Sequence, residues 1–235
     1  MPFGAHETME VHECLMEKVN MLNQFNFYLK QAESQELQDM IVRHQQAAIR
    51  SYNDLLAYTH DYSRFAPIPP NTNLSGISPG TIQYGVRDPR PLQPESSINQ
   101  LRDRETASGM LLCHKNAAKN SMWASLETAD PNLRKMLLNS AVNCSNQAYE
   151  VFLYMNQLGM YQVAEMNDDT AKTLLHSYVP TGKELESTYF GGGEQQNPYQ
   201  GGMNQGQSGY GHAGKQPGYN GGHPAPGTMY GEGGK

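Results

Sequence analysis

Residues 63–95 read SRFAPIPPNTNLSGISPGTIQYGVRDPRPLQPE and hold seven of the 14 prolines in the 235-residue chain. Proline interrupts regular helices, so this stretch is predicted to be an irregular connection. Antiparallel neighbours in a helix bundle are usually joined by about 2–8 residues. A link of this length instead reaches up to ~100 Å. It can therefore run the whole length of a helical body, and the helices on either side of it can point the same way.

The blocks on either side of this link are almost free of helix breakers. Within 6–61 and 96–158, Gly109 and Pro131 are the only glycine and proline. Apolar residues recur there every three or four positions, which predicts four amphipathic helices. The predicted core positions are Val11, Leu15, Val19, Leu22, Phe25 and Leu29 in the first helix, Leu37, Ile41, His44, Ala48, Tyr52, Leu55, Thr59 and Tyr62 in the second, Leu101, Met110, Leu111, His114, Ala118, Ser121 and Leu126 in the third, and Leu133, Leu137, Ala141, Cys144, Ala148, Val151, Met155 and Leu158 in the fourth.

The predicted helices group into two hairpins, 6–62 and 96–158, joined by the crossover 63–95. Two helical hairpins with a long crossover between them make a ferritin-like four-helix bundle. We therefore predict an all-α body over residues 1–161.

Capping residues support the predicted helix ends. Ser34 precedes the second helix and can accept an amide proton from its first turn. Asp130 followed by Pro131 is typical of a helix start, and Gly159 is suited to a left-handed cap that ends the fourth helix.

The two hairpins also echo one another in sequence. A shift of 96 residues places Leu37 on Leu133, Met40 on Met136, Ile41 on Leu137, Val42 on Leu138, Leu55 on Val151 and Tyr58 on Tyr154. Any two amphipathic helices share part of such a pattern, but the agreement favours an internal duplication.

Residues 162–190 are predicted to be a partly ordered extension with a short helix near Thr170–Tyr178. The last segment, 191–235, holds 16 glycines and four prolines. With few apolar side chains to bury, nothing offsets the entropy of ordering it, so we expect a disordered Gly/Tyr/Gln-rich tail.

The tail is the predicted place for covalent chemistry. Tyrosines in a mobile glycine-rich segment can couple oxidatively, and glutamine next to lysine can form isopeptide bonds. The cross-linking candidates are Tyr199, Tyr210, Tyr219, Tyr230, Gln216, Lys215 and Lys235. A solubilising or adhesive tail without covalent chemistry is the alternative.

Composition excludes several classes of partner and compartment. The chain has 17 Lys and Arg against 23 Asp and Glu and no basic stripe, which argues against nucleic acid as a partner. No apolar stretch approaches the length of a membrane span, and the first residues do not resemble a signal peptide. Cys14, Cys113 and Cys144 are an odd number without paired spacing, so neither a disulfide framework nor a zinc site is predicted. We expect synthesis in a reducing cytoplasm.

A ferritin-like bundle raises the question of a di-iron or di-manganese centre. Such a centre takes a Glu from each of two helices and a Glu-x-x-His pair from each of the other two. The chain contains no Glu-x-x-His: Ile41 stands three residues before His44, and Leu137 stands three before Ser140 at the matching place. We therefore predict no catalytic, cofactor-binding or metal-binding residues and no cofactor.

His44 and His114 both fall on core stripes and can approach each other. One reading is a residual metal or ligand site that also uses Glu13 or Glu105. The favoured reading is a pair of neutral core histidines, hydrogen-bonded to polar neighbours. Cys113 and His114 point about 100° apart on a helix, so they cannot act together as nucleophile and base.

Segments of the second hairpin resemble the Coat F family, the spore coat protein F-like proteins of endospore-forming Firmicutes. These segments are 101–105 (LRDRE), 115–118 (KNAA), 129–134 (ADPNLR), 148–156 (AYEVFLYMN) and 159–161 (GMY). The first hairpin resembles a more diverged copy of the same unit.

This resemblance implies a structural rather than an enzymatic protein. It implies synthesis in the mother-cell cytoplasm, incorporation into the spore coat and contacts with other coat proteins. It transfers no catalytic residue to this chain. With it we expect a homo-oligomer and no membrane insertion. Two rivals remain: a divergent metal-dependent oxidase or catalase, and a soluble adaptor that recruits partners through its tail.

Overall fold

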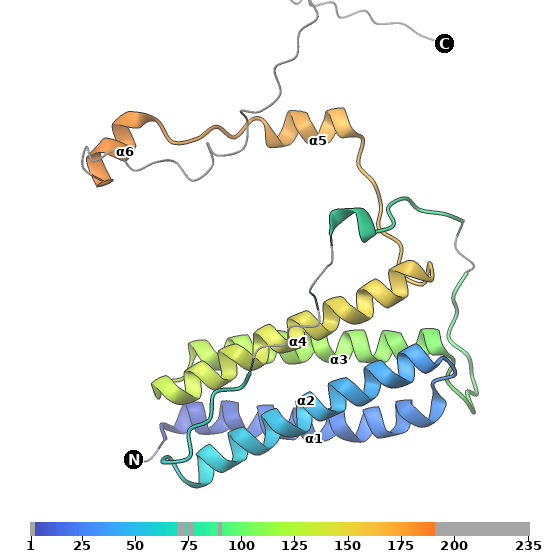
Figure 1. Cartoon of the computed structure of the whole chain (residues 1–235), viewed down its shortest axis with the longest axis vertical. Helices are drawn as coiled ribbons and strands as arrows, with labels where there is room; N and C mark the ends of the chain where they lie inside the picture. The colour runs from blue at the N-terminus through green and yellow to red at the C-terminus, as the bar shows by residue number, and fades with distance from the viewer. Residues whose placement is uncertain (1–2, 70–73, 75–77, 89–90, 191–235) are drawn as a thin grey trace, which may run out of the picture. The chain divides into compact units, whose positions relative to one another are not determined.

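A computed structural model of the chain describes residues 3–69, 74, 78–88 and 91–190. The predicted tail 191–235, with all its cross-linking candidates, lies outside these described residues. The described part is helical and has no β-strand beyond a single isolated bridge, which confirms the all-α prediction (Figure 1). None of its helices is long and apolar enough to cross a membrane.

The chain divides into two compact units, Met1–Leu175 and His176–Lys235. The first contains four long helices and one short helix, and the second contains another short helix in its described part. Their bounds are α1 Ala5–Gln31, α2 Gln35–His60, α3 Asp103–Leu126, α4 Pro131–Gln157, α5 Asp168–Leu175 and α6 Lys183–Phe190, with a 3-10 turn η1 at Pro79–Thr81. α5 overlaps the short helix predicted near 170–178, whereas α6 was not predicted.

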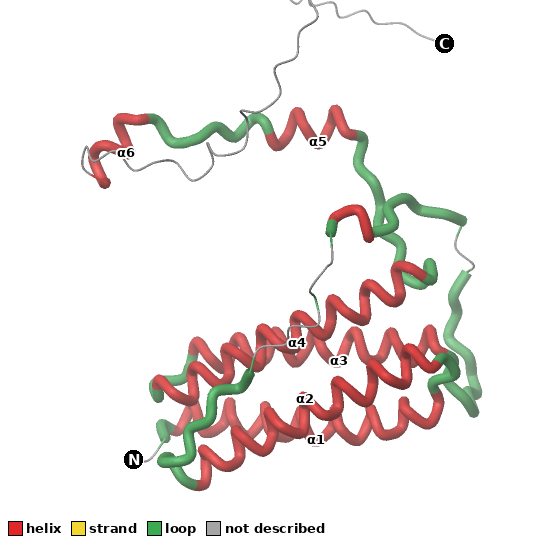
Figure 2. Tube along the Cα trace, viewed as in Figure 1, coloured by secondary structure: helices red, strands yellow, loops and turns green. Residues whose placement is uncertain are grey.

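The four long helices lie side by side around a common core. α1 packs against α2 and α3, and α4 packs against α3 and α2, as Figure 2 also shows. The backbone amides of Glu33 and Ser34, just before α2, donate to the carboxylate of Asp103 at the start of α3. α2 and α3 therefore begin at the same end and run in the same direction, as the length of the crossover predicted.

The crossover is anchored on α4 at two places. Ile68 is buried, and its carbonyl accepts a hydrogen bond from Asn139 of α4. Farther on, the backbone of Gln83 makes two hydrogen bonds with the side chain of Asn156, near the end of α4. These contacts hold the proline-rich link along the helical body.

The helix ends follow the predicted capping chemistry. The Ser34 hydroxyl accepts from the Leu37 amide at 3.2 Å, and the Asp130 carboxylate accepts from the Leu133 amide at 2.7 Å. Gly159 adopts a φ of 69° just after α4. Only glycine reaches this left-handed region readily, so the predicted cap is confirmed.

Hydrogen bonds at the two ends of the helical body repeat with the same spacing of 96 residues. Glu7 accepts hydrogen bonds from the backbone amides of residues 129–130. Its counterpart Asp103 accepts from the amides of residues 33–34. Each carboxylate at the start of one hairpin thus holds the turn of the other.

A second pair of contacts obeys the same shift. The Tyr58 hydroxyl donates to Asp130, while the Tyr154 hydroxyl bonds the hydroxyl of Ser34. The polar contacts therefore match between the halves as well as the apolar ones, which supports an internal duplication with approximate two-fold symmetry.

The core stripe of α1 differs from the prediction. Its buried residues are Glu7, Val11, Cys14, Lys18, Met21 and Phe25. Val19, predicted to be buried, is 44% exposed, and the predicted core residues Tyr62, Leu126 and Leu158 are also exposed. Counting apolar residues misplaced the α1 stripe by part of a turn because two charged residues, Glu7 and Lys18, occupy the inward face.

Gly109 allows α3 to approach α1 closely. A Cβ atom at this position would lie 2.7 Å from Cζ of Tyr28 on α1. In an exposed helix, Gly→Ala stabilises by about 1 kcal/mol. We expect Gly109→Ala instead to lower the free energy of unfolding by about 1–2 kcal/mol through overpacking, measured by urea denaturation. In a Tyr28→Leu background the same change should become stabilising; an unchanged cost there would contradict this explanation.

Candidate functional site

Four polar side chains face one another in the middle of the helical body, one from each long helix. Lys18 of α1, His44 of α2, His114 of α3 and Ser140 of α4 are all buried. Burying a polar group costs free energy unless the group is hydrogen-bonded. These four residues are therefore the candidate functional site. We refer to it as the central polar layer.

A chain of hydrogen bonds crosses the layer from α2 to α3 and α4. His44 Nδ1 lies 3.0 Å from Nε2 of His114, and His44 Nε2 lies 2.9 Å from Oε2 of Glu150 on α4. The other oxygen of Glu150 accepts from the Arg43 guanidinium. The ring of Phe25 packs edge-to-face against His114. The predicted approach of the two histidines is therefore present, with a carboxylate as their further partner.

The protonation states follow from this geometry. Burial disfavours the charge on Glu150, but hydrogen bonds from His44 and Arg43 outweigh it and hold the pKa of the carboxyl below its ordinary value. An ionised Glu150 requires a proton on Nε2 of His44. One further proton then lies between Nδ1 of His44 and Nε2 of His114, which are 3.0 Å apart.

His114 ends the chain as a neutral ring. Burial, followed by the proximity of His44 and Lys18, holds its pKa well below the ordinary value of 6.5. Its Nδ1 has no hydrogen-bond partner among the described residues. The favoured reading of His114 as a neutral core histidine agrees with this environment.

Lys18 crosses the layer along the other diagonal. Its ammonium donates to Ser51 of α2 at 2.9 Å and to Ser140 of α4 at 3.0 Å. The shift of 96 residues carries Lys18 onto His114 and Ser140 back onto His44. The Lys18–Ser140 and His114–His44 contacts are therefore counterparts in the two halves of the duplication.

The two predicted carboxylate candidates lie elsewhere. Glu13 is exposed on α1, and Glu105 accepts a hydrogen bond from the amide of Arg102 at the start of α3. The carboxylate that does meet the histidines, Glu150, was not predicted. One sequence signal could have found it, because Glu150 is the only acidic residue in α4.

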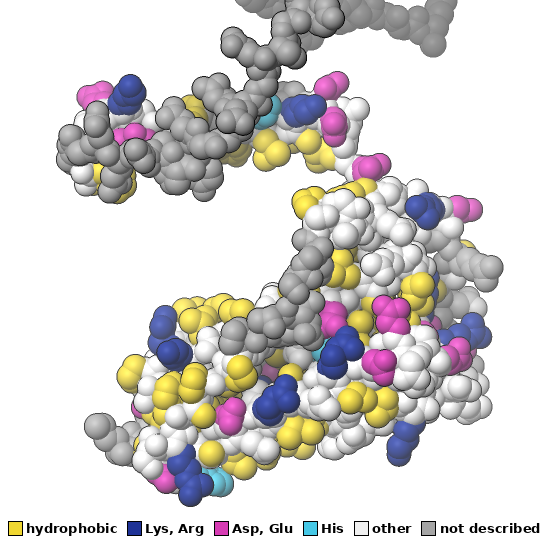
Figure 3. Space-filling view, viewed as in Figure 1, with side chains coloured by type: hydrophobic (Ala, Val, Ile, Leu, Met, Phe, Trp, Pro, Cys, Tyr) yellow, Lys and Arg dark blue, Asp and Glu magenta, His cyan; other side chains and the backbone are white. Residues whose placement is uncertain are grey.

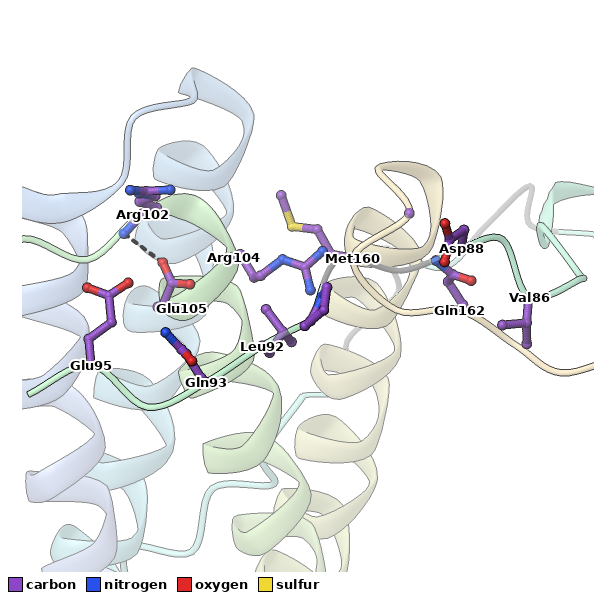
Figure 4. A pocket seen from close by; sticks show the side chains of 12 residues that line it. Val86, Asp88, Leu92, Gln93, Glu95, Arg102, Arg104, Glu105, Met160 and Gln162 are labelled. Carbon is purple, nitrogen blue, oxygen red and sulfur yellow. Dashed lines mark hydrogen bonds between the residues drawn. The ribbon is translucent and has the colours of Figure 1, made fainter.

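Glu105 instead lines a cavity of about 1100 Å³ where the crossover passes the start of α3 and the end of α4. Figure 4 shows its side chain facing the crossover residues Gln93 and Glu95. Arg104 and Met160 also line this cavity.

The central polar layer does not fit a pair of carboxylate-bridged metal ions. Ile41 and Leu137, at the places where a Glu-x-x-His motif needs glutamate, are both buried in the core. Within the described part of the chain, no group of three or more His, Cys, Asp or Glu side chains is arranged to hold a metal ion. The layer's polar atoms bond one another across the helices.

The three cysteines are free thiols. Burial raises the pKa of Cys14 to about 11 and that of Cys113 to about 12, and it also raises the pKa of Cys144. Only the thiolate is a strong nucleophile, so Cys113 beside His114 stays a protonated, unreactive thiol at neutral pH.

Comparison with known proteins identifies two similarities. Residues 102–164 match the Coat F domain, which covers α3, α4 and the turn after them. Over 194 residues, 82% of this chain and 88% of the relative, the sequence is 28% identical to the spore coat protein F-like protein YhcQ of Bacillus subtilis (strain 168). No solved structure matches the chain. The resemblance to the Coat F family that the sequence predicted is therefore confirmed, with the match to the domain lying over residues 102–164.

Proposed function

We propose that this protein is a structural component of the bacterial endospore coat. The observation that carries the proposal is the Coat F domain at residues 102–164, together with similarity to a spore coat protein F-like protein over 82% of the chain. We propose synthesis in the mother-cell cytoplasm, incorporation into the coat, and assembly with copies of itself and with other coat proteins.

The central polar layer supports a structural rather than a catalytic role. His44 bonds His114 and Glu150, while Lys18 bonds Ser51 and Ser140. All of these side chains except the partly buried Glu150 are buried between helices. A catalytic group must reach its substrate, whereas these groups join all four long helices. We therefore assign them to holding the helical body together.

We further propose that the body over residues 1–161 is a ferritin-like four-helix bundle that has no metal centre. The parallel α2 and α3, the crossover anchored on α4 and the matched contacts of the two hairpins support this class. In this proposal, residues 162–190 form an extension and 191–235 a separate tail.

Fractionation of spores tests the coat assignment. An epitope-tagged chain should be recovered with the coat and released only by detergent and reducing alkali that dissolve coat layers. Recovery in the soluble spore or mother-cell fraction would contradict the proposal and favour the adaptor alternative.

Deletion of residues 191–235 tests the cross-linking role. The tail offers Gln216 and Lys215 for transamidation, which joins two side chains and releases ammonia, and four tyrosines whose coupling gives two hydrogen atoms to an oxidant. We expect the deleted protein to reach the coat but to become several-fold more extractable. Tyr→Phe at all four tyrosines should give the same extractability if phenol coupling is the linkage and wild-type extractability if transamidation is. If the protein without residues 191–235 were no more extractable than wild type, the cross-linking role would be contradicted.

A further inference from the structure

The outer surface of the second hairpin carries an apolar groove between α3 and α4. It has a volume of about 510 Å³. The residues that line it include Lys119, Met122, Trp123, Leu126 and Val142. Trp123 is 60% and Leu126 66% exposed. We call these five residues the α3–α4 face. Figure 3 shows hydrophobic side chains gathered over the helical body, with Lys and Arg side chains among them.

The duplication supplies an internal comparison for this groove. The counterparts of Met122 and Ala141, 96 residues earlier, are Asn26 and Gln45. These two side chains hydrogen-bond each other at 2.7 Å across α1 and α2. In the first hairpin, this hydrogen bond covers the surface between the two helices. In the second hairpin, the matching surface is an apolar groove. Because the two halves share their core pattern, the groove comes from its side chains and not from the fold.

The helix segments that form the groove carry basic but no acidic side chains. Between residues 106 and 126 of α3, and between 131 and 149 of α4, the chain has no acidic residue. It has four basic ones there: Lys115, Lys119, Arg134 and Lys135. An apolar groove with Lys119 at its edge fits a partner surface that is apolar and acidic.

The outer side of α1 is such a surface. Met9 and Met16 are 56% and 59% exposed, and the exposed Glu13 lies between them. Their spacing, i, i+4 and i+7, places the three on one side of the helix, opposite the buried stripe. We call them the α1 face. Methionine packs well against aromatic rings such as that of Trp123, and Glu13 is opposite in charge to Lys119.

We propose that a second copy of this chain docks here, with the α1 face of one copy packed against the α3–α4 face of the next. The contact is a helix laid into a hydrophobic groove, with complementary charge at its edge. It joins two different surfaces, so it repeats from copy to copy and builds a ring or a filament. The proposal deepens the coat role and rests on it, because it names the packing contact.

Two charge reversals of exposed residues in the full-length protein test the contact. Wild type should associate with rising concentration in sedimentation velocity, and emission of Trp123, the only tryptophan in the chain, should shift to the blue as it becomes buried. Glu13→Lys and Lys119→Glu should each weaken association about tenfold or more. An equimolar mixture should regain association, because the two intact faces match and the two reversed faces also carry opposite charges. Arg50→Glu, an exposed reversal on α2, should associate like wild type.

Two outcomes would overturn the contact: a wild type that stays monomeric with unshifted emission, or Glu13→Lys associating as strongly as wild type. The coat role fails separately. A chain recovered in the coat but monomeric in solution would refute only the interface, and a self-associating chain absent from the coat would refute the coat role.

Discussion

Replacing Glu7 by alanine is expected to lower the free energy of unfolding by about 3 kcal/mol. The Glu7 side chain is buried, and its carboxylate accepts from the amides of Gly4, Ala129 and Asp130 at 2.6, 2.9 and 3.2 Å. Removing it leaves these donors without their charged acceptor. Hydrogen bonds to charged groups contribute about 1.5–3 kcal/mol, and this carboxylate accepts three of them. Urea denaturation followed by circular dichroism measures the loss.

Two further variants complete this test: one at the counterpart of Glu7 in the second hairpin, and one at an exposed glutamate of α1 as a control. Asp103→Ala removes the matching acceptor at the other end of the body, where the carboxylate is less buried, so we expect a loss of about 2 kcal/mol. The ends are far apart, so the two losses should add. Glu13→Ala, at an exposed site on α1, should change stability by about 0.5 kcal/mol or less. A similar effect of Glu7→Ala and Glu13→Ala would contradict the role given to Glu7.

Acid should destabilise the protein through His114. The pKa of His114 is held well below 6.5 in the folded state, first by burial and then by His44 and Lys18. Below pH 6.5 the unfolded chain binds a proton at this histidine and the folded chain does not. Stability therefore falls as pH falls, by up to about 1.4 kcal/mol per pH unit. Between pH 7 and 5 the loss is at most about 2 kcal/mol.

His114→Leu should remove this part of the pH dependence while lowering stability at neutral pH. The neutral loss is expected because Nδ1 of His44 loses its partner. Ile41→Val, a core change that costs about 1 kcal/mol, should lower stability equally at both pH values and keep the slope. Denaturation at pH 7 and 5 measures all three proteins. An unchanged slope in His114→Leu would show that another group titrates.

Sequence periodicity predicted α2 and α4 better than α1. All eight buried positions of α2 have buried counterparts in α4 at the spacing of 96 residues. In α1, apolar residues lie on more than one side, because Met9, Met16, Val19 and Phe27 are exposed. The periodicity of apolar residues carries no information about two contacts that bury charged side chains of α1. Lys18 bonds two serines of other helices, and Glu7 bonds the turn between α3 and α4.

For the candidate site too, some features follow from the sequence and others only from the tertiary structure. The sequence alone determined the helices, their caps, the direction of the second hairpin and the absence of a Glu-x-x-His motif, because these depend on local chemistry and chain length. It also placed His44 and His114 on facing stripes. Only the tertiary structure decided that Glu150 completes their hydrogen-bond chain, that Glu7 and Asp103 hold each other's hairpin turns, and that the proline-rich link lies along α4. Such contacts join residues about 70–120 positions apart, and a pattern with a period of a few residues carries no information about them.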